Sequence, residues 1–500
     1  MLDQLKNTVK NSFLYSIGNM AGKLSGIILL PLYTKFLPVS DYGLLALLEV
    51  TYLLILAISG FGVKSALTRY YWDKDLAGKE KSLFYTSYLF NVLASIVTIV
   101  ILFVLIQNYS GSMFGVELSA KLIIAFTLSS LVRLLADSPM LLLRIQQKAF
   151  HQTAVQIIVL LITVGLTVYL IAVRGMGLEA VFIAQLIANS VALVLLLPTI
   201  IRNIQVKFDF PLLRELLHFG IPLFLSNLLS IVLVLSDRFI LNIFGTLENV
   251  GNFSLAFKIS NIVQVIFVTS FMNAYQHIFY KQMSEENPGR FYTKSMTYFM
   301  LVIIFVAIGL VLFSKETIKV LSMGNEEYWN SYTLVPILVV GVVFGGMRQI
   351  LILPLSRLKM TRIISKVSIL AAMLNFVLNL ILIPFLSSVG AAVSTAITQV
   401  LASVWLYYLV RKHDTIEYEI GKILKCLALG LQFYGIAVAV DDLSLAWRLV
   451  IKSTLYLSFF LLLYVWNFYE RVELERLGGA WKKWKNLRNF RQNISEIKIQ

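Results

Sequence analysis

The sequence predicts an all-α polytopic membrane protein with about fourteen transmembrane helices. Hydrophobic residues make up 58% of the 500 positions and charged residues 14%, whereas a soluble domain is nearer half apolar and a quarter charged. Mean hydropathy is +0.80. The apolar residues also group into runs of roughly 20 residues, the length that crosses about 30 Å of hydrocarbon.

The predicted spans follow one another along the whole chain, joined by short polar connections. They are residues 13–34, 42–62, 83–106, 121–142, 152–173, 178–200, 220–243, 251–279, 295–314, 334–356, 363–385, 389–410, 422–440 and 446–466. The residues before the first span are polar, and that span is long enough to cross the membrane, so no cleavable signal peptide is expected.

The distribution of Lys and Arg orients these spans. Loops on the side of Met1 carry 31 of the 43 basic residues, and loops on the opposite side carry 6. Cytoplasmic loops of membrane proteins are enriched in Lys and Arg, so we predict that both termini lie in the cytoplasm. The same bias accounts for most of the formal charge of +16, so no nucleic-acid partner is expected.

Two stretches of the sequence repeat at a nearly constant offset. Residues 36–43 align with residues 244–251 at an offset of 208, and residues 174–177 align approximately with residues 387–390 at an offset of 213. Because six spans separate the copies, the two halves share one orientation, as in parallel-repeat transporters. The predicted parts are an N-lobe (1–200), a linker (201–219), a pseudo-symmetric C-lobe (220–410), two extra spans (411–466) and a basic cytoplasmic tail (467–500).

The linker and the tail both have amphipathic patterns. Asp209 can cap a helix, Pro211 fits its first turn, and the leucines that follow share one face. This predicts a helix lying on the cytoplasmic surface. In the tail, Trp481 and Trp484 stand among five cations, which suits binding to anionic membrane lipids; a solvated basic tail is the alternative.

Charged residues inside the predicted spans give the first indication of function. The six cations are Lys23, Arg133, Arg238, Lys258, Arg348 and Lys452. The four acids in the same zone or at its margins are Glu49, Asp137, Glu179 and Asp237. A charge at the bilayer centre costs roughly 2.5–3.5 kcal/mol and normally faces a partner or a wet cavity. The excess of cations indicates that something anionic is handled within the membrane.

Polar stripes mark two spans that suit a cavity wall. The stripe on the first span consists of Tyr15, Asn19 and Lys23, and the stripe on the eighth consists of Ser254, Lys258 and Asn261. A Lys so far from either end of its span cannot easily reach the interface. It therefore either lines a cavity or takes part in a structural ion pair.

Two ion pairs are suggested by spacing. Under the offset of 208, Glu49 falls one position from Lys258, so the two lie at about the same depth and form either a switchable or a static pair. Arg133 and Asp137 stand at i and i+4, which favours a structural pair within one helix.

Three further charges are harder to assign. Adjacent residues on a helix point about 100° apart, so Asp237 and Arg238 are not expected to neutralise each other. Arg348 stands close to three glycines on the tenth span, and its role stays open.

Catalytic patterns are missing from the sequence. The four His are scattered without metal-ligand spacing, no G-x-x-x-x-G-K-[ST] phosphate loop occurs, and the single Cys426 offers no disulfide. We therefore expect no enzyme, no metal and no cofactor. Transport would instead draw on a Na⁺ or H⁺ gradient or on the membrane potential.

Three short motifs resemble a known family. The first span followed by residues 36–43, the residues 375–384, and residues 389–392 resemble polysaccharide biosynthesis flippases of the multidrug/oligosaccharidyl-lipid/polysaccharide exporter superfamily. The resemblance implies two six-helix lobes that form a V around a central cavity lined by spans 1, 2, 7 and 8. It implies that the last two spans guide a lipid tail.

The resemblance also implies roles for individual cations. Lys23 and Lys258 match cavity cations that contact the diphosphate of a polyprenyl-linked oligosaccharide, and Arg238 is a further candidate. Arg69 would stand at the cytoplasmic mouth of the cavity. Arg133 and Arg348 lie on helices that are not usually central in this family.

The leading hypothesis is a flippase for a polyprenyl-diphosphate-linked O-antigen, capsule or exopolysaccharide repeat unit. It would work by alternating access in a prokaryotic cytoplasmic membrane, beside a polysaccharide polymerase and glycosyltransferases. One alternative is a cation-coupled multidrug or metabolite exporter, in which Glu49 and Asp237 would be essential. Another is a membrane scaffold for glycan assembly that acts through its basic tail.

Overall fold

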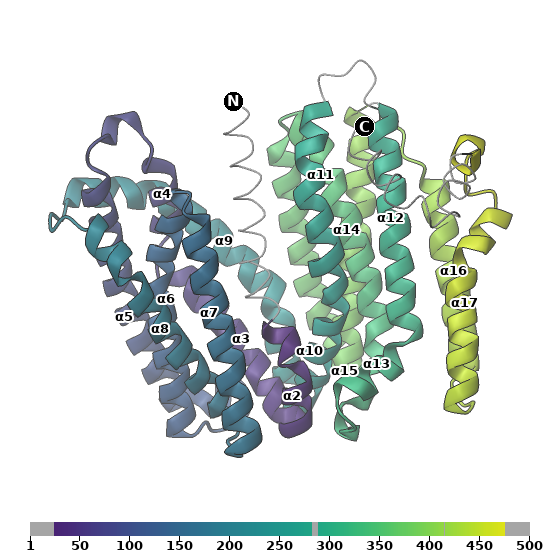
Figure 1. Ribbon diagram of the computed structural model, residues 1–500, viewed down its shortest axis with the longest axis horizontal. Helices are drawn as coiled ribbons and strands as arrows, with labels where there is room; N and C mark the ends of the chain where they lie inside the picture. The colour runs from purple at the N-terminus through teal and green to yellow at the C-terminus, as the bar shows by residue number, and fades with distance from the viewer. Residues whose placement is uncertain (1–24, 283–288, 415, 476–500) are drawn as a thin grey trace, which may run out of the picture. The chain divides into compact units, whose positions relative to one another are not determined.

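A computed structural model describes residues 25–282, 289–414 and 416–475, and every regular element in these ranges is helical (Figure 1). This confirms the all-α class predicted from composition and periodicity. Tyr15, Asn19 and Lys23 lie outside the described residues, and so do Trp481 and Trp484 of the tail.

The first half of the chain forms a bundle of helices, most of them long. In chain order they are α2 (Leu30–Phe36), α3 (Val39–Ile58), α4 (Val63–Tyr70), α5 (Glu80–Phe114), α6 (Ala120–Ile145), α7 (Ala149–Val168), α8 (Glu179–Asn203) and α9 (Phe210–Phe244). A π-helical turn, Tyr169–Val173, extends α7. Helix α6 packs against α5 and α8, and α8 packs against α7, so that α5 to α8 stand side by side (Figure 1).

The second half contains further helices, again mostly long. They are α10 (Leu247–Val263), α11 (Thr269–Lys281), α12 (Gly289–Leu312), α13 (Ser314–Leu321), α14 (Val335–Arg357), α15 (Thr361–His413), α16 (Ile420–Ala439) and α17 (Leu445–Val465). The π-helical turn Gln264–Val268 joins α10 to α11, and the 3₁₀ segment Glu326–Leu334 precedes α14. Helix α12 packs against α16 and α17.

Eleven of the described helices are long and apolar enough to cross a membrane. They account for twelve of the fourteen predicted spans, because α15 contains both 363–385 and 389–410. Helix α6 coincides with the predicted span 121–142 but is not among the eleven. The first predicted span lies mostly outside the described residues, with the apolar segment Ser25–Phe36 as its described end.

Helix α15 is broken where the sequence predicts a connection. Ser387 has φ 50° and ψ −129°, far from helical values, and Pro384 just before it cannot continue the backbone hydrogen-bond pattern. The chain then turns back closely on itself: a Cβ on Gly390 would lie 2.4 Å from the carbonyl oxygen of Leu382. Glycine is therefore required at this turn.

The described chain divides into two compact units. The first comprises the residues up to Asn261 together with Lys315–Gly341 and Arg362–Ala402, and the second comprises Ile262–Ser314, Val342–Thr361 and the residues from Ser403 on. The predicted lobe boundaries at 200 and 220 stay a prediction.

The linker predicted at 201–219 is not a separate surface helix. Its residues 210–219 form the beginning of α9, where the Asp209 carboxylate accepts a hydrogen bond from Leu212 N at 3.0 Å as predicted. Leu212 and Leu216 are buried against Val63 and Leu67 of α4. An amphipathic pattern shows only that one face is apolar; here that face packs on protein rather than lipid.

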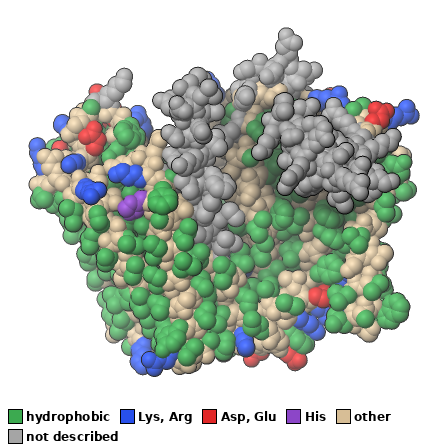
Figure 2. Space-filling view, viewed as in Figure 1, with side chains coloured by type: hydrophobic (Ala, Val, Ile, Leu, Met, Phe, Trp, Pro, Cys, Tyr) green, Lys and Arg blue, Asp and Glu red, His purple; other side chains and the backbone are tan. Residues whose placement is uncertain are grey.

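The sides of the first bundle are apolar. Figure 2 shows hydrophobic side chains over the helices α5 to α8, with Lys and Arg gathered towards the helix ends. On α5, large apolar side chains are exposed over several consecutive turns, among them Leu93, Val97, Val100 and Val104. A surface of this kind is stable in hydrocarbon and not in water, which agrees with a multi-pass membrane protein.

Equivalent segments of the two repeat copies contact each other where α3 crosses α10. A Cβ on Gly43 of α3 would lie 2.0 Å from the Leu247 carbonyl oxygen, and a Cβ on Gly251 of α10 would lie 2.2 Å from that of Val39. The offset of 208 relates Gly43 to Gly251 and Val39 to Leu247. The contact is therefore reciprocal, as a local two-fold axis between repeat copies requires, and glycine lets the backbones approach closely.

Candidate functional site: two polar cavities among membrane helices

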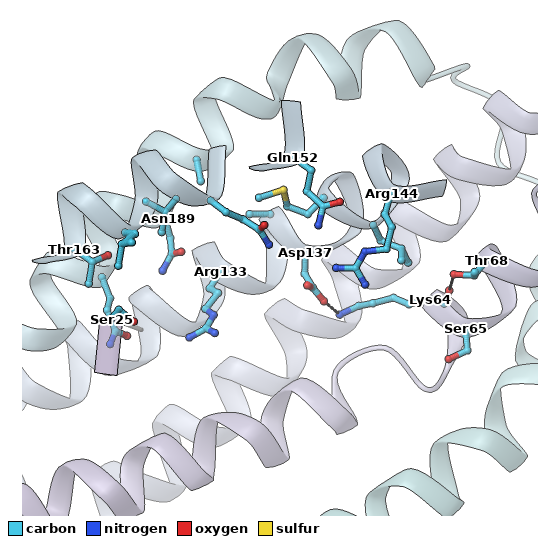
Figure 3. Close-up of a pocket in the computed structure, with 18 residues that line it drawn as sticks. Ser25, Lys64, Ser65, Thr68, Arg133, Asp137, Arg144, Gln152, Thr163 and Asn189 are labelled. Atoms are coloured by element: carbon cyan, nitrogen blue, oxygen red, sulfur yellow. Dashed lines mark hydrogen bonds and ion pairs between the residues drawn. The ribbon is translucent and has the colours of Figure 1, made fainter. Parts of the chain in front are cut away.

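A cavity of about 520 Å³ lies among α4, α6, α7 and α8 of the first unit (Figure 3). We call it the large cavity. Its polar lining consists of Ser25, Lys64, Ser65, Thr68, Arg133, Asp137, Arg144, Gln152, Gln156, Thr163, Gln185 and Asn189. Polar side chains are rare inside membrane helices and mark the path or the site of a hydrophilic ligand.

The charged side chains of the large cavity come from α4 and α6. Lys64 of α4 forms an ion pair with Asp137 of α6 (Figure 3). Neither Arg133 nor Arg144 has a carboxylate partner within the described ranges. Both line the cavity, and both side chains are exposed. Three cations therefore face one carboxylate, and the field in the cavity favours an anion.

Helix periodicity explains how α6 presents its charges together. Arg133 and Asp137 are four residues apart, and Arg144 follows after a further seven, so all three fall on one face. On α4, Lys64 and Thr68 are likewise four residues apart and both line the cavity. The packing of α4 against α6 then brings Lys64 to Asp137.

Amide side chains form the opposite wall. Gln152 and Gln156 lie one turn apart on α7, and Gln185 and Asn189 lie one turn apart on α8. Figure 3 shows Gln152 and Asn189 across the cavity from Arg133 and Asp137. The large cavity therefore has a charged wall, made by α4 and α6, and an amide wall, made by α7 and α8.

The predicted pair of Arg133 with Asp137 is not formed, and this prediction was wrong. Asp137 pairs with Lys64, and Arg133 lies over the ring of Tyr52 with its guanidinium carbon 4.3 Å from the ring centroid. Spacing of i and i+4 permits a pair within a helix, but α4 and α3 supply partners that the spacing cannot reveal.

A second cavity, of about 240 Å³, lies among α3, α9 and α10 within the first unit. We call it the small cavity. It brings together five predicted site residues, namely Glu49, Arg238, Ser254, Lys258 and Asn261. The polar stripe predicted on residues 254–261 therefore does face a cavity.

Glu49 and Lys258 form an ion pair across the small cavity. The Lys258 ammonium lies 3.7 Å from the nearer Glu49 oxygen and 5.5 Å from the centroid of the Tyr42 ring. This proximity agrees with the depth that the repeat offset assigned to the two residues. At 3.7 Å the two groups are near the longest distance at which an ion pair forms. That this pair opens during a transport cycle stays a prediction.

Asp237 and Arg238 do neutralise each other, contrary to expectation. Asp237 Oδ1 accepts hydrogen bonds of 2.8 Å from both the backbone N–H and the Nη1 of Arg238. The argument from helix directions overlooked the length of the Arg side chain, which can curl back to its neighbour. The guanidinium also lies over Phe257, 4.5 Å from the ring centroid, so Arg238 is held on two sides.

Three other charged residues within the described ranges line neither cavity. Arg69 is largely exposed and pairs with Asp73 at 3.3 Å. Arg348 belongs to α14 in the second unit, where its Nε finds no hydrogen-bond partner among the described residues. Lys452 is buried and lies 3.4 Å from Asp441, so it has a local partner.

Sequence reasoning missed most of the large cavity. The predicted spans leave Lys64 and Arg144 in cytoplasmic loops. In the structure both residues belong to helices, α4 and α6, and both side chains line the cavity. The amides carried a signal that could have been used, because Gln152 and Gln156, and Gln185 and Asn189, repeat every four residues. The same rule identified the stripe containing Lys258.

The fold and the two polar cavities among apolar helices define a multi-pass membrane transport protein. Residues 8–276 match the family of polysaccharide biosynthesis proteins, which is more than half of the chain. The protein belongs to this family, as the sequence motifs predicted.

Individual relatives agree with this assignment. A probable low-salt glycan biosynthesis flippase, Agl15 of Haloferax volcanii, is 23% identical over 431 residues, covering 85% of this chain and 88% of the relative. The lipid II flippase MurJ in an inward closed conformation has a similar structure, with a TM-score of 0.71 and 16% identity over 90% of this chain and 99% of that one.

The same fold occurs among drug transporters. An inward-facing multidrug resistance transporter of the MATE family gives a TM-score of 0.60 and 14% identity over 80% of this chain and 94% of that one. At such identities the structural likenesses establish the fold alone. The relatives found are flippases and transporters rather than enzymes, in agreement with the expectation from the sequence.

Proposed function

We propose that the protein is a flippase for an oligosaccharide linked to a polyprenyl diphosphate. The headgroup moves from the cytoplasmic to the outer leaflet of a prokaryotic cytoplasmic membrane by alternating access, while the lipid tail stays in the bilayer. A gradient of Na⁺ or H⁺, or the membrane potential, supplies the energy. The glycan flippase and the lipid II flippase among the relatives support this class of substrate.

One observation carries the proposal: the large cavity holds three cations against one carboxylate among helices with apolar sides. A diphosphate carries about two negative charges and accepts charge-assisted hydrogen bonds. Arg133 and Arg144, which have no carboxylate partner in the described part of the chain, offset the desolvation of those charges as the headgroup leaves water. The small cavity adds Lys258 and Arg238, each beside its own acid.

The charge of the cavities also weighs against the drug-exporter alternative. A transporter for organic cations needs carboxylates that are free to bind them, whereas Asp137, Glu49 and Asp237 all face basic partners. The scaffold alternative rests on the basic tail, most of which lies outside the described residues. Neither alternative explains why Arg side chains with no carboxylate partner among the described residues line a cavity.

The test is translocation in reconstituted vesicles. A fluorescent polyprenyl-diphosphate oligosaccharide is placed in one leaflet, and its arrival in the other is followed by a membrane-impermeant quencher. We expect the double variant Arg133→Gln/Arg144→Gln to lose at least about a hundredfold in rate, since two charge-assisted contacts are removed.

The matched control is Lys148→Gln, which removes one positive charge at an exposed position next to α7 and should leave the rate unchanged. Wild-type rates in the double variant would overturn the proposal. So would a wild-type protein that moves an organic cation but no lipid diphosphate.

A further inference from the structure

The amide wall of the large cavity lacks a structural explanation. Gln152 and Gln156 of α7 line the same cavity as Gln185 and Asn189 of α8, and no side-chain hydrogen bond joins any of the four to another described residue. The Oε1 atoms of Gln152 and Gln156 are buried without a partner. Gln152 is only 1% exposed, so its amide has been taken out of solvent without compensation from the fold.

A neighbouring amide shows what a structural role looks like. Gln146, at the end of α6, donates hydrogen bonds of 2.8 Å to both Tyr71 and Asn203. Amides in membrane helices commonly hold helices together through such bonds. Gln146 does so within the first unit through its Nε2, although its Oε1 has no partner among the described residues. The four amides of the amide wall form no such bond to a described residue.

We propose that the amide wall is a subsite for the uncharged sugar next to the diphosphate. This rests on the proposed function and refines it. An amide offers both donors and acceptors, and so does a sugar hydroxyl or an N-acetyl group. The wall on α7 and α8 carries no charged side chain in the lining of the cavity, so it matches a neutral, hydroxyl-rich ring.

The position of the two walls fits one headgroup. The charged wall and the amide wall face each other across a single cavity of about 520 Å³, as Figure 3 shows for Arg133 and Asp137 opposite Asn189 and Gln152. Phosphates bound by Arg133 or Arg144 would place the first sugar against the amides. The partly exposed amides of Gln156, Gln185 and Asn189 would then form hydrogen bonds with its hydroxyls. The Oε1 atoms of Gln152 and Gln156, which are buried in this structure, would reach the ring by rotation of their side chains.

The test compares two probes on purified protein in detergent: a polyprenyl diphosphate without sugar, and the same lipid carrying a neutral disaccharide. We expect wild-type protein to bind the glycosylated lipid more tightly. The double variant Gln156→Leu/Asn189→Leu should lose about tenfold in affinity for the glycosylated lipid and keep its affinity for the bare one. Arg144→Gln should weaken binding of both probes.

Thermal unfolding separates a binding role from a structural one. Gln152→Leu removes no side-chain hydrogen bond to any described residue, so its unfolding temperature should equal or exceed that of the wild type. Gln146→Leu breaks two bonds and should lower the unfolding temperature. A fall for Gln152→Leu as large as that for Gln146→Leu would overturn the inference.

The binding results keep the two proposals apart. Equal wild-type affinity for both lipids, or equal weakening of both by the Gln156→Leu/Asn189→Leu variant, would overturn the sugar subsite while the flippase proposal stands. Failure of wild-type protein to bind either lipid would instead overturn the flippase proposal, and the subsite with it.

Discussion

The large cavity and an ion cluster of the second unit use similar side chains but differ in how completely these are paired. The ion cluster joins the beginnings of α12 and α16 to the segment after α17. Its members are Arg290, Lys294, Glu419, Lys422, Glu470 and Glu473. Lys294 alone contacts all three carboxylates, with Glu419 at 2.8 Å and Glu473 at 3.4 Å, and Lys422 and Arg290 pair with Glu470.

The comparison separates polar groups that stabilise the fold from groups that await a ligand. In the ion cluster three cations meet three carboxylates, so the network is balanced and satisfied. In the large cavity two Arg side chains and at least two amide oxygens have no such partners in the described part of the chain. Since most buried polar groups in proteins are paired, the unpartnered Gln152 and Gln156 oxygens are unusual, and the two exposed Arg side chains add positive charge to the same cavity. This combination is the better indicator of function.

The largest effect should follow from reversing a charge in the large cavity. Arg144→Glu leaves two cations facing two carboxylates, so the preference for an anion is removed. We expect binding of a polyprenyl diphosphate to weaken at least about a hundredfold, with no fall in unfolding temperature, because Arg144 has no ion-pair partner among the described residues. A loss of stability with unchanged binding would show that the large cavity, like the ion cluster, serves to stabilise the fold.

Breaking the ion cluster should give the opposite result. Lys294→Met leaves carboxylates facing one another, and we expect a destabilisation of about 2 kcal/mol, less than the roughly 3–5 kcal/mol of a fully buried pair, because the Lys294 side chain is 18% exposed. Denaturant unfolding in detergent measures it. The affinity of the folded protein for lipid diphosphate should not change; a concurrent loss of affinity would argue against a purely structural cluster.

Removing one acid from each cavity should sharpen the picture further. Asp137→Asn releases Lys64, and Glu49→Gln releases Lys258. If these acids occupy cations that the substrate later needs, affinity for lipid diphosphate should rise about three- to fivefold in each variant. An unchanged affinity together with lower stability would show that the ion pair is structural and does not open. The result for the large cavity and the result for the small cavity are independent of each other.

The smallest expected effect is a pH dependence of the ion cluster. Burial would raise the pKa of Glu419, but hydrogen bonds from Lys294, Lys422 and Thr297 outweigh it and lower the pKa from 4.5 to about 2. A carboxylate with a lowered pKa stabilises the fold above its unfolded value, and this contribution is lost as the pH falls towards 2. Wild-type unfolding temperature should therefore drop by about 2–4 °C more than that of Glu419→Gln between pH 6 and pH 3.

The spans were predictable because hydrocarbon imposes a simple rule. Every backbone N–H and C=O must be paired inside the segment, so an apolar run of sufficient length becomes a helix almost regardless of its details. The break at Ser387 and the cap at Asp209 were predictable for a similar reason, since both follow from local backbone chemistry. The family was also predictable from short motifs, and the match to residues 8–276, which includes the first of these motifs, confirmed the family.

The site was predictable only in part. Periodicity placed Lys258, Ser254 and Asn261 on one face, and the repeat put Glu49 beside Lys258, and the small cavity contains all four. Periodicity could not show which helix would cover that face. It therefore failed for Asp137, whose partner Lys64 comes from another helix.

The sequence by itself determined that this chain is a helical membrane protein with an excess of cations among its spans, because length and hydropathy decide what hydrocarbon accepts. Only the tertiary structure decided which of those charges are neutralised and which stay available. The physical reason is that an ion pair or a hydrogen bond requires contact within about 4 Å. Helix spacing fixes the direction of a side chain, but the packing of α4, α6, α7 and α8 chooses its neighbours.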